Sequence, residues 1–279
     1  MAQSAAGGAS MNWRKWLLIS IVVGYMGILI IAPLGAIVFG AFREGAPAVL
    51  EALQHPHVLR SFGLTLIICL VVVSIHGIFG TLVAWVLVRH QFVGKALVNR
   101  LLDLPFAMSP VIVGFTLIVL FGRNGVLKPL TEALDWQIAF ALPGMILATL
   151  FVTLPFMVRE LMPVLEAFGR KQEEAAATLG ASGWQTFRLV TFPALRWAFL
   201  YGLGLTCARA LGEFGAVLVI SGGIQGRTET ATVYIFRALD DRQYAGAYSA
   251  ALLLGAISLV LVLVIDVFHR RSQKSIEQR

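Results

Sequence analysis

Two charged side chains, Arg209 and Glu213, lie within an otherwise apolar segment of the sequence. On a helix that begins near Trp197, a rise of ~1.5 Å per residue places Arg209 about 18 Å along the axis and Glu213 one turn further. Charges this deep in an apolar span are costly and normally face a partner or a water-filled path. In one interpretation the two residues neutralise each other as a structural pair. In the other they border a translocation path, and they either bias that path towards a dianion or help to gate it.

Other residue types that carry chemistry do not form a set. His76 lies in an apolar segment without an accompanying acid and nucleophile, so we interpret it as a packed polar side chain. His55 and His57, in the sequence HPH, are only a weak indication of a metal site. Cys69 and Cys207 lie in apolar runs without partners at metal-ligand spacing. The phosphate-binding pattern G-x-x-x-x-G-K-[ST] does not occur. We therefore expect no catalytic residue, no bound metal, no nucleotide site and no enzyme activity in this chain.

The composition indicates which elements must position these residues. Of the 279 residues, 58% are hydrophobic and 13% are charged, and the mean hydropathy is +0.82, whereas a soluble domain is about one-quarter charged. Crossing the hydrocarbon core takes about 20 apolar residues, and the sequence contains six such stretches. They lie at residues 16–42, 62–88, 105–121, 138–158, 197–220 and 247–268. The predicted fold is an all-α polytopic membrane protein with six transmembrane helices, the first of which is retained and not cleaved as a signal peptide.

Lysine and arginine residues are divided unequally between the two sides of this predicted bundle. With a cytoplasmic N-terminus, the inner segments hold fourteen of them and the outer loops hold seven. The positive-inside rule then predicts that the tails at residues 1–15 and 268–279 are both cytoplasmic, and that residues 16–59 form the first span and an outer loop. The same rule accounts for much of the net charge of +7 without a nucleic-acid partner.

The loop at residues 159–196 is the longest on the predicted cytoplasmic side. Within it, Gln172 to Leu179 is a run of good helix formers, and acidic residues occupy the first turn, where the helix dipole favours them. Gly180 follows this run, and a glycine adopts the left-handed conformation of a helix C-terminal cap more readily than other residues. The sequence predicts a short helix that ends in a tight turn.

A second short helix is predicted directly after that turn. Ser182 and Gln185 have the spacing of a capping box, which starts a helix over Trp184 to Val190. Pro193 follows and is expected to end this helix, because proline lacks the backbone N–H that a helix interior needs. Two short helices joined by a tight turn are therefore expected between the fourth and fifth spans.

These two helices present a surface on which another protein can dock. Ala175, Ala176 and Ala177 supply minimal bulk, while Trp184 and Phe187 supply an aromatic anchor for a pocket. A DNA-binding helix-turn-helix is disfavoured, because basic and acidic residues nearly balance in this loop and its tethers to the membrane are short. An amphipathic connector that rests at the membrane interface is a second alternative.

Small residues recur at every fourth position of the fifth span. They are Gly204, Ala208, Gly212 and Ala216. Residues at this spacing share one face of a helix, and small side chains there allow two helix backbones to approach closely. The sequence predicts that one face of this span packs against other helices and that the neighbouring face carries Arg209 and Glu213.

The docking loop resembles a known family signature. Glu174-Ala175-Ala176, then three residues, Gly180, nine residues and the sequence VTFP (190–193) are similar to the EAA signature of ABC-importer permeases, which usually closes with Ile-x-Leu-Pro. Val190 and Phe192 depart from that pattern but keep its apolar character. The resemblance implies that the loop is a coupling helix seated in a cleft of a cytoplasmic ATPase subunit. The residues assigned to this coupling are Glu173, Glu174, Ala175, Ala176, Gly180, Trp184, Phe187 and Pro193.

Longer stretches, from about Arg60 to Asp266, resemble permeases of the sulfate/thiosulfate family. They are LLDLPFAMSPVIVG (101–114), PFMVRELMPVL (155–165), EEAAATLGASGWQTFRLVTFPALRWAFLYG (173–202) and ARALGEFGAVLVISGGIQG (208–226). The GEFGA element and its preceding arginine are shared with molybdate and tungstate permeases. The resemblance implies a type I ABC importer permease domain over residues 60–267, with the coupling loop at 159–196, that transports sulfate or thiosulfate, or alternatively molybdate or tungstate.

The resemblance also implies the remaining parts of the importer. They are a homologous permease, two ATPase subunits that bind ATP-Mg, and a periplasmic sulfate-binding protein, assembled with membrane lipid in the bacterial inner membrane. This chain is then expected to bind no cofactor and no nucleic acid. A secondary transporter or channel that works without a motor is the remaining alternative, although inverted repeats are not visible in the sequence.

Overall fold

The computed structural model describes residues 13–277, and within that range the chain forms helices and loops without a strand. The first half contains α1 (Trp13–Phe42), α2 (Ala46–Gln54), α3 (Pro56–Ile75), the π-helical turn η1 (His76–Gly80), α4 (Thr81–Arg89), α5 (Lys95–Leu101), α6 (Leu104–Ala107), α7 (Pro110–Phe121) and α8 (Lys128–Ala133). The second half contains α9 (Leu142–Phe168), α10 (Lys171–Thr178), α11 (Gly183–Thr186), the π-helical turn η2 (Phe187–Thr191), α12 (Phe192–Leu211), α13 (Gly215–Ser221), α14 (Ala231–Asp240) and α15 (Tyr244–Glu277).

Five segments within residues 13–277 are helical, long and apolar enough to cross a membrane. They are Lys15–Phe42, Pro56–Arg89, Leu142–Phe168, Gly183–Leu211 and Tyr244–Asp266. The predicted third span, residues 105–121, lies across a bend, because the helical segments Lys95–Ala107 and Pro110–Phe121 meet at an angle of 110°. Ser109 at the break has an extended backbone (φ −64°, ψ 133°), since a following proline disfavours the helical conformation. The described residues therefore contain five continuous helical segments of this kind and one bent pair.

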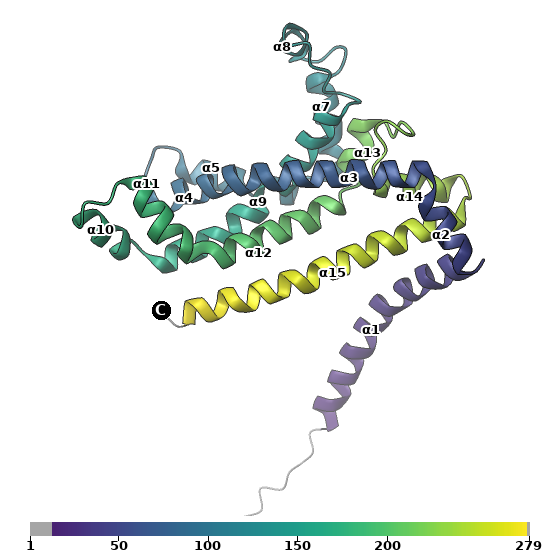
Figure 1. Ribbon diagram of the computed structural model, residues 1–279, viewed down its shortest axis with the longest axis horizontal. Coiled ribbons are helices and arrows are strands. Elements are labelled where there is room, and N and C mark those ends of the chain that lie inside the picture. Colours follow the sequence, from purple (N-terminus) through teal and green to yellow (C-terminus); the bar gives the residue numbers. More distant parts are fainter. Residues whose placement is uncertain (1–12, 278–279) are drawn as a thin grey trace, which may run out of the picture.

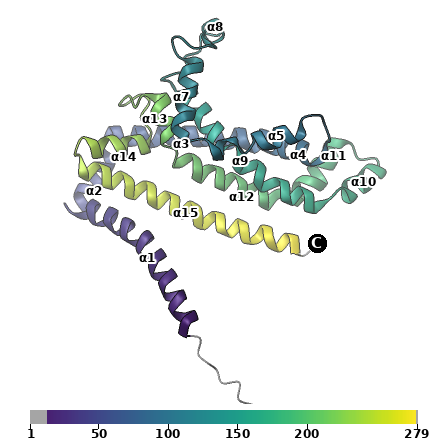
Figure 2. The same cartoon turned by 180° about the vertical axis from the view of Figure 1, so that it is seen from behind.

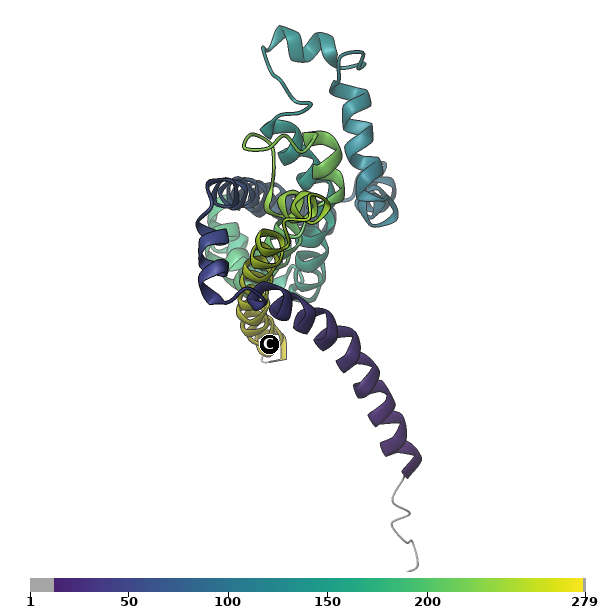
Figure 3. The same ribbon diagram turned by 90° about the vertical axis from the view of Figure 1, so that its right-hand side faces the viewer.

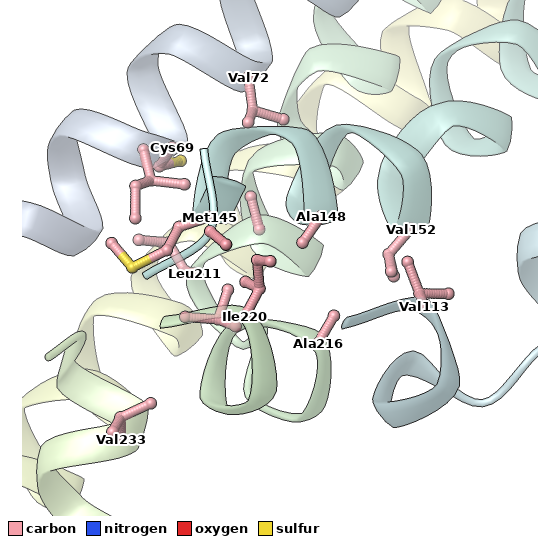
Figure 4. Packing of buried hydrophobic residues seen from close by; sticks show 14 residues of the cluster. Cys69, Val72, Val113, Met145, Ala148, Val152, Leu211, Ala216, Ile220 and Val233 are labelled. Atoms are coloured by element: carbon pink, nitrogen blue, oxygen red, sulfur yellow. The ribbon is translucent and has the colours of Figure 1, made fainter. Parts of the chain in front are cut away.

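The long helices lie side by side around α12 (Figure 1). α12 packs against α3, α9 and α15 along the bundle. Near α13, side chains such as Met145 and Ile220 form a fully buried apolar cluster that joins α3, α7, α9 and α13 (Figure 4). A second cluster, which includes Met157 and Leu161, joins α4, α9 and α12. Within a membrane, this close van der Waals packing is what holds one helix to the next.

Two parts of the chain project from this bundle. α1 leaves the bundle beside α2 and diverges from α15 (Figure 3), and its apolar side chains are exposed, Ile28 and Ile31 by 70% each. α7 and α8 project on the other side of the bundle, next to α13 (Figure 2). Both projecting parts expose apolar side chains that are suited to contact lipid or other membrane helices.

Two helices extend beyond the ends of the predicted spans. α9 runs from Leu142 to Phe168, so the loop predicted to begin at residue 159 begins ten residues later. Polar residues mark the edge of the membrane, but they are good helix formers and do not end a helix. α15 continues to Glu277, so the predicted C-terminal tail is helical over residues 268–277. Residues 1–12 of the predicted N-terminal tail and residues 278–279 lie outside the described residues.

The predicted fifth span, residues 197–220, is wrong as a single helix. α12 ends at Leu211, and α13 begins only at Gly215. In the break, a carboxylate oxygen of Glu213 accepts a hydrogen bond of 3.0 Å from the backbone N–H of Ala216. The hydroxyl of Thr232 donates a hydrogen bond of 2.7 Å to the backbone carbonyl of Glu213. These bonds satisfy backbone groups that the interruption of the helix leaves open.

Candidate functional site

The predicted turn after the first short helix is confirmed. α10 carries Glu173 and Glu174 in its first turn, and Gly180 has a φ of +87°, in the left-handed region that favours glycine. The N–H of Gly180 donates to the carbonyl of Ala177 (3.0 Å), and the N–H of Ala181 donates to that of Ala176 (3.1 Å). This pair of bonds is a Schellman motif, which satisfies the last carbonyls of a helix and reverses the chain.

The predicted capping box is also confirmed, but the helix does not end at Pro193. The N–H of Ser182 donates to the side-chain oxygen of Gln185 (2.8 Å), and the N–H of Gln185 donates to the Ser182 hydroxyl (3.3 Å). α11 then leads through η2 into α12, so that Gly183–Leu211 is one continuous helical segment. Pro193 lies inside this continuous segment, directly beyond the π-helical turn η2, where the regular i→i−4 hydrogen bonds that a proline would break are already interrupted.

Most of the predicted docking surface is exposed. Glu174 and Ala175 are exposed on α10, and Ala176 is half-buried. Trp184 is 68% exposed and stacks on Phe187, with ring centroids 5.8 Å apart and planes at 24°. The stacked pair leaves one aromatic face open beside a small-residue surface, which is a suitable anchor for another protein.

Glu173, which was assigned to ATPase coupling, does not belong to this exposed surface. Its carboxylate forms an ion pair with Arg89, with Nε and Oε2 at 2.9 Å and side-chain exposures of 7% for Arg89 and 16% for Glu173. The hydroxyl of Thr191 also donates to its Oε1 at 2.8 Å. Because residues 173 and 174 are ~100° apart around the helix axis, one carboxylate points inwards while its neighbour points outwards.

Sequence reasoning missed Arg89, which was counted only as one of the inner basic residues. Its Nη1 donates to the carbonyl of Leu165 (3.2 Å), and its Nη2 donates to that of Gly169 (2.7 Å). The guanidinium of Arg170 in turn donates to the backbone carbonyl of Arg89. One side chain thus joins the end of α4 to the end of α9 and to α10. The available signal was an arginine at the very end of an apolar span together with a second glutamate next to the EAA sequence.

Arg209 and Glu213 form the predicted ion pair, but across a break in the helix. Arg209 Nη1 and Glu213 Oε2 are 2.7 Å apart, and the side chains are 30% and 2% exposed, respectively. Glu213 is fixed further by its bond to the N–H of Ala216 near the start of α13. The carboxylate is therefore a buried structural group, whereas the guanidinium keeps part of its surface open.

The four small residues of the predicted ridge do not share one packing face. Gly204 lies so close to α15 that a Cβ would overlap Ile265, and Ala216 is fully buried in α13, which packs on α7. Ala208 is half-buried and Gly212 is exposed at the end of α12. The prediction of a single ridge is wrong because it assumed a continuous helix, and that helix stops at Leu211.

The remaining candidate residues have ordinary partners. His76 is buried in η1, where its Nε2 lies 3.0 Å from the Thr153 hydroxyl and 3.1 Å from the Leu150 carbonyl. The two thiols, Cys69 and Cys207, are free and in contact between α3 and α12. Among the residues that the structure describes, no three His, Cys, Asp or Glu side chains are placed to hold a metal ion.

Comparison with known proteins assigns this arrangement to a family. A family model described as "Binding-protein-dependent transport system inner membrane component" matches residues 76–278. The chain belongs to this permease family. Its members are components of transport systems, and the chain is accordingly a transport subunit and not an enzyme.

Relatives within this permease family include sulfate permeases. The chain is 46% identical to the sulfate transport system permease protein CysW of Synechococcus elongatus, over 91% of this chain and 89% of that protein. It is 43% identical to CysW of Escherichia coli K12, over 93% of this chain and 89% of that protein. It is 36% identical to CysT of the same organism, over 88% of this chain and 89% of that protein.

Solved structures confirm the fold class of this permease. A bacterial alginate ABC transporter in complex with a pentasaccharide-bound periplasmic protein includes a chain that matches with a TM-score of 0.74 and 20% identity, over 92% of this chain and 95% of that one. A second alginate importer structure matches with a TM-score of 0.73 and 18% identity, over 94% and 96% of the two chains. The predicted architecture, an all-α permease of a type I ABC importer, is confirmed.

Proposed function

We propose that this chain is one of the two membrane permeases of an ATP-driven importer for sulfate and thiosulfate. The observation that carries the proposal is the identity of 42–46% to CysW proteins of three organisms over about nine-tenths of the chain. Identity to CysT is lower, at 36%, which favours a CysW-like position in a pair of different permeases. Molybdate or tungstate remains the alternative cargo that an experiment must exclude.

The proposed importer contains four kinds of subunit. A CysT-like permease completes the translocation path, two CysA-like ATPases bind ATP-Mg, and a periplasmic sulfate-binding protein delivers the anion. The exposed face of α10 and α11 is the docking surface for one ATPase, through Glu174, Ala175, Trp184 and Phe187. ATP binding draws the two ATPases together and moves the docked loops, and hydrolysis resets them, while this chain itself binds no cofactor.

The chain is oriented in this proposal with both termini in the cytoplasm of a bacterial cell. The excess of lysine and arginine on the inner segments supports this orientation. So does the position of the last turns of α15, which lie at the same end of the bundle as α10 and α11 (Figure 1). The loop between α13 and α14 lies towards the other end, on the proposed periplasmic side.

Within the proposed path, Arg209 and Glu213 have different roles. Glu213 is buried and ties the start of α13 to α12, so its role is structural. Arg209 is the partly open member of the pair and provides a positive charge beside the path of a dianion. Because Glu213 neutralises part of its charge, the Arg209 guanidinium favours entry of the anion without binding it so tightly that it cannot leave.

The proposal is tested by uptake into vesicles that contain the complete complex. Radiolabelled sulfate should enter in an ATP-dependent manner, and excess thiosulfate should compete, because both are tetrahedral dianions of sulfur. Uptake of molybdate that excess sulfate does not reduce would contradict the assignment of substrate. Uptake by this chain alone, without ATPase, would contradict the importer class and favour a secondary transporter or channel.

A further inference from the structure

The α10–α11 loop, residues 171–186, is held to the bundle in an unusual way. None of the eight residues of α10 is buried, so apolar packing does not fix its position. Gly169 and Gly180, which flank α10, both have a positive φ (+68° and +87°), and a Cβ at either position would meet nothing within 4 Å. α10 lies between these two glycine turns, which have open space around them. Its position therefore depends on polar contacts.

The main polar contact is the cluster of Arg89, Glu173 and Thr191, which we call the clamp. Arg89 Nη2 donates a hydrogen bond of 3.1 Å to Oε1 of Glu173, and Arg89 Nε lies 2.9 Å from Oε2 in an ion pair that lacks hydrogen-bond geometry. A hydrogen bond between ionised groups is stronger than one between neutral groups, so this contact holds the carboxylate in place. Thr191 holds the same carboxylate from the side of η2.

The clamp joins α10 to elements that continue through the membrane. Arg89 is the last residue of the continuous segment Pro56–Arg89, and Thr191 lies within the segment Gly183–Leu211. Arg89 also binds the carbonyls of Leu165 and Gly169 at the end of α9, where the helix dipole favours a positive charge. A displacement of Glu173 is therefore passed directly to three spans.

We propose that the clamp is the mechanical link of this permease: Glu173 passes the motion of the α10–α11 loop to the span that ends at Arg89, while the adjacent Glu174 only binds the ATPase. This inference rests on the proposed function. Arg89 and Glu173 are positioning residues, which touch neither ATP nor the transported anion. The two glutamates thus have separate roles, one in docking and one in transmission.

The test compares two identical chemical changes at neighbouring positions. The complete complex carries either Glu173→Gln or Glu174→Gln, and three quantities are measured: the Kd of the ATPase for the permease pair, the rate of ATP hydrolysis, and the ratio of anion imported to ATP hydrolysed. Glu173→Gln should leave the Kd unchanged and lower the ratio by about five-fold or more, the lower end of usual coupling between sites. Glu174→Gln should weaken binding of the ATPase, but the complexes that still form should keep the wild-type ratio of anion imported to ATP hydrolysed.

Changes on the other side of the clamp provide a second line of evidence. Arg89→Gln should lower the ratio as Glu173→Gln does, and the double variant should be no worse than either single one, because both remove the same contact. Arg89→Lys should recover part of the ratio, since lysine keeps the charge but lacks the planar guanidinium with which arginine binds Leu165, Gly169 and Glu173 at once. If the glutamine variants do not assemble, Thr191→Val tests the clamp instead, because it removes one hydrogen bond to Glu173 while nearly keeping the shape of the side chain.

Several results would overturn the inference. A weaker Kd with an unchanged ratio in Glu173→Gln would make Glu173 a docking residue, and an unchanged Kd and ratio would leave the clamp without a role in coupling. If the glutamine variants do not assemble, an unchanged ratio in an assembled Thr191→Val complex would likewise show that the clamp has no role in coupling. The wild-type complex separates the role of the clamp from the identity of the substrate. If the wild-type complex does not import sulfate, the proposed cargo is wrong, and the ratio is then measured with the oxyanion that the complex does import.

Discussion

At the residue scale, neighbouring charged side chains of this protein differ sharply in their surroundings. Glu173 is held by Arg89 and Thr191, whereas Glu174 is exposed. Arg209 is 30% exposed, but its partner Glu213 is only 2% exposed. A charge that remains buried after its partner is removed is far more costly than one that water can reach. The surroundings of each residue, more than its type, therefore determine what a substitution does.

The turn at Gly180 is expected to be intolerant of a β-branched side chain. Gly180→Val should strain the left-handed backbone by on the order of 1–2 kcal/mol and tilt or fray α10 and α11 without touching a membrane span. The variant should assemble with its partner permease but lose ATPase binding or coupling, as measured by substrate-stimulated ATP hydrolysis and uptake. Gly183→Ala is the matched control, because a Cβ at Gly183 meets nothing within 4 Å. Wild-type stimulation and uptake in Gly180→Val would reduce this loop to a connector.

The unequal burial of Arg209 and Glu213 predicts an unequal cost of removing each. Arg209→Gln leaves the buried carboxylate of Glu213 without its ion pair and should destabilise the protein by on the order of 3 kcal/mol. Glu213→Gln leaves an arginine that is partly open to its surroundings, and it keeps an oxygen for the Ala216 N–H. It should therefore cost less, and the double variant should be more stable than Arg209→Gln alone. Thermal unfolding of the purified permease measures this order, and equal Tm values for the two single variants would contradict it.

At the element scale, the helices are held by two different kinds of contact. α12 packs tightly between α9 and α15, with Ala198 and Leu195 almost completely buried. α10 has no buried residue and is fixed by the polar clamp. Closely packed interiors transmit strain and resist deformation, whereas α10 can shift without opening the apolar core. This difference suits a loop that moves against a firm bundle.

The contact between α12 and α15 is expected to be sensitive to one added carbon. In Gly204→Ala the new Cβ would overlap Ile265 of α15, and overpacking of this kind costs about 1–3 kcal/mol. The Tm of the purified permease should fall, and the second change Ile265→Ala should restore part of the loss. Gly255→Ala on α15, where a Cβ meets nothing within 4 Å, should leave the Tm unchanged. A stable Gly204→Ala variant would show that α15 moves aside freely.

At the scale of the whole molecule, the bundle separates two functional ends. α10, α11 and the last turns of α15 lie at one end, and α2, α14 and the loop before α14 lie at the other (Figures 1 and 2). In the proposed importer the first end meets the ATPase and the second meets the binding protein. The projecting helices α1 and α7 leave apolar side chains exposed for contacts outside the chain.

This arrangement predicts the topology in the cell. Reporter tags fused to the two termini should both be found in the cytoplasm, and a tag inserted near Gly223, between α13 and α14, should be found outside. The reason is that five continuous spans and one bent pair return the chain to the side on which it started, if the bent pair crosses the membrane. Labelling of single cysteines from outside gives an independent measurement. Termini on opposite sides would mean that Lys95–Phe121 does not cross.

The sequence by itself determined the features that depend on local chemistry. The left-handed turn at Gly180, the capping box of Ser182 and Gln185 and most of the apolar spans were predicted correctly, because hydropathy and backbone capping act over a few neighbouring residues. The exposed Trp184 and the half-buried Phe187 stack on each other, and their role as a docking anchor stays a prediction. A family resemblance that follows these local patterns then identified the class of protein.

Only the tertiary structure decided which of these residues meet. Arg89 and Glu173 are 84 residues apart in the chain, and the local sequence marks each as an unusual charge without indicating that the two pair. At the break after Leu211, Thr232 of a later helix binds the carbonyl of Glu213, and the helix through Pro193 contains a π-helical turn that propensity does not predict. Contacts between distant segments form only when the helices pack, and they decided where α12 stops and which glutamate faces the bundle.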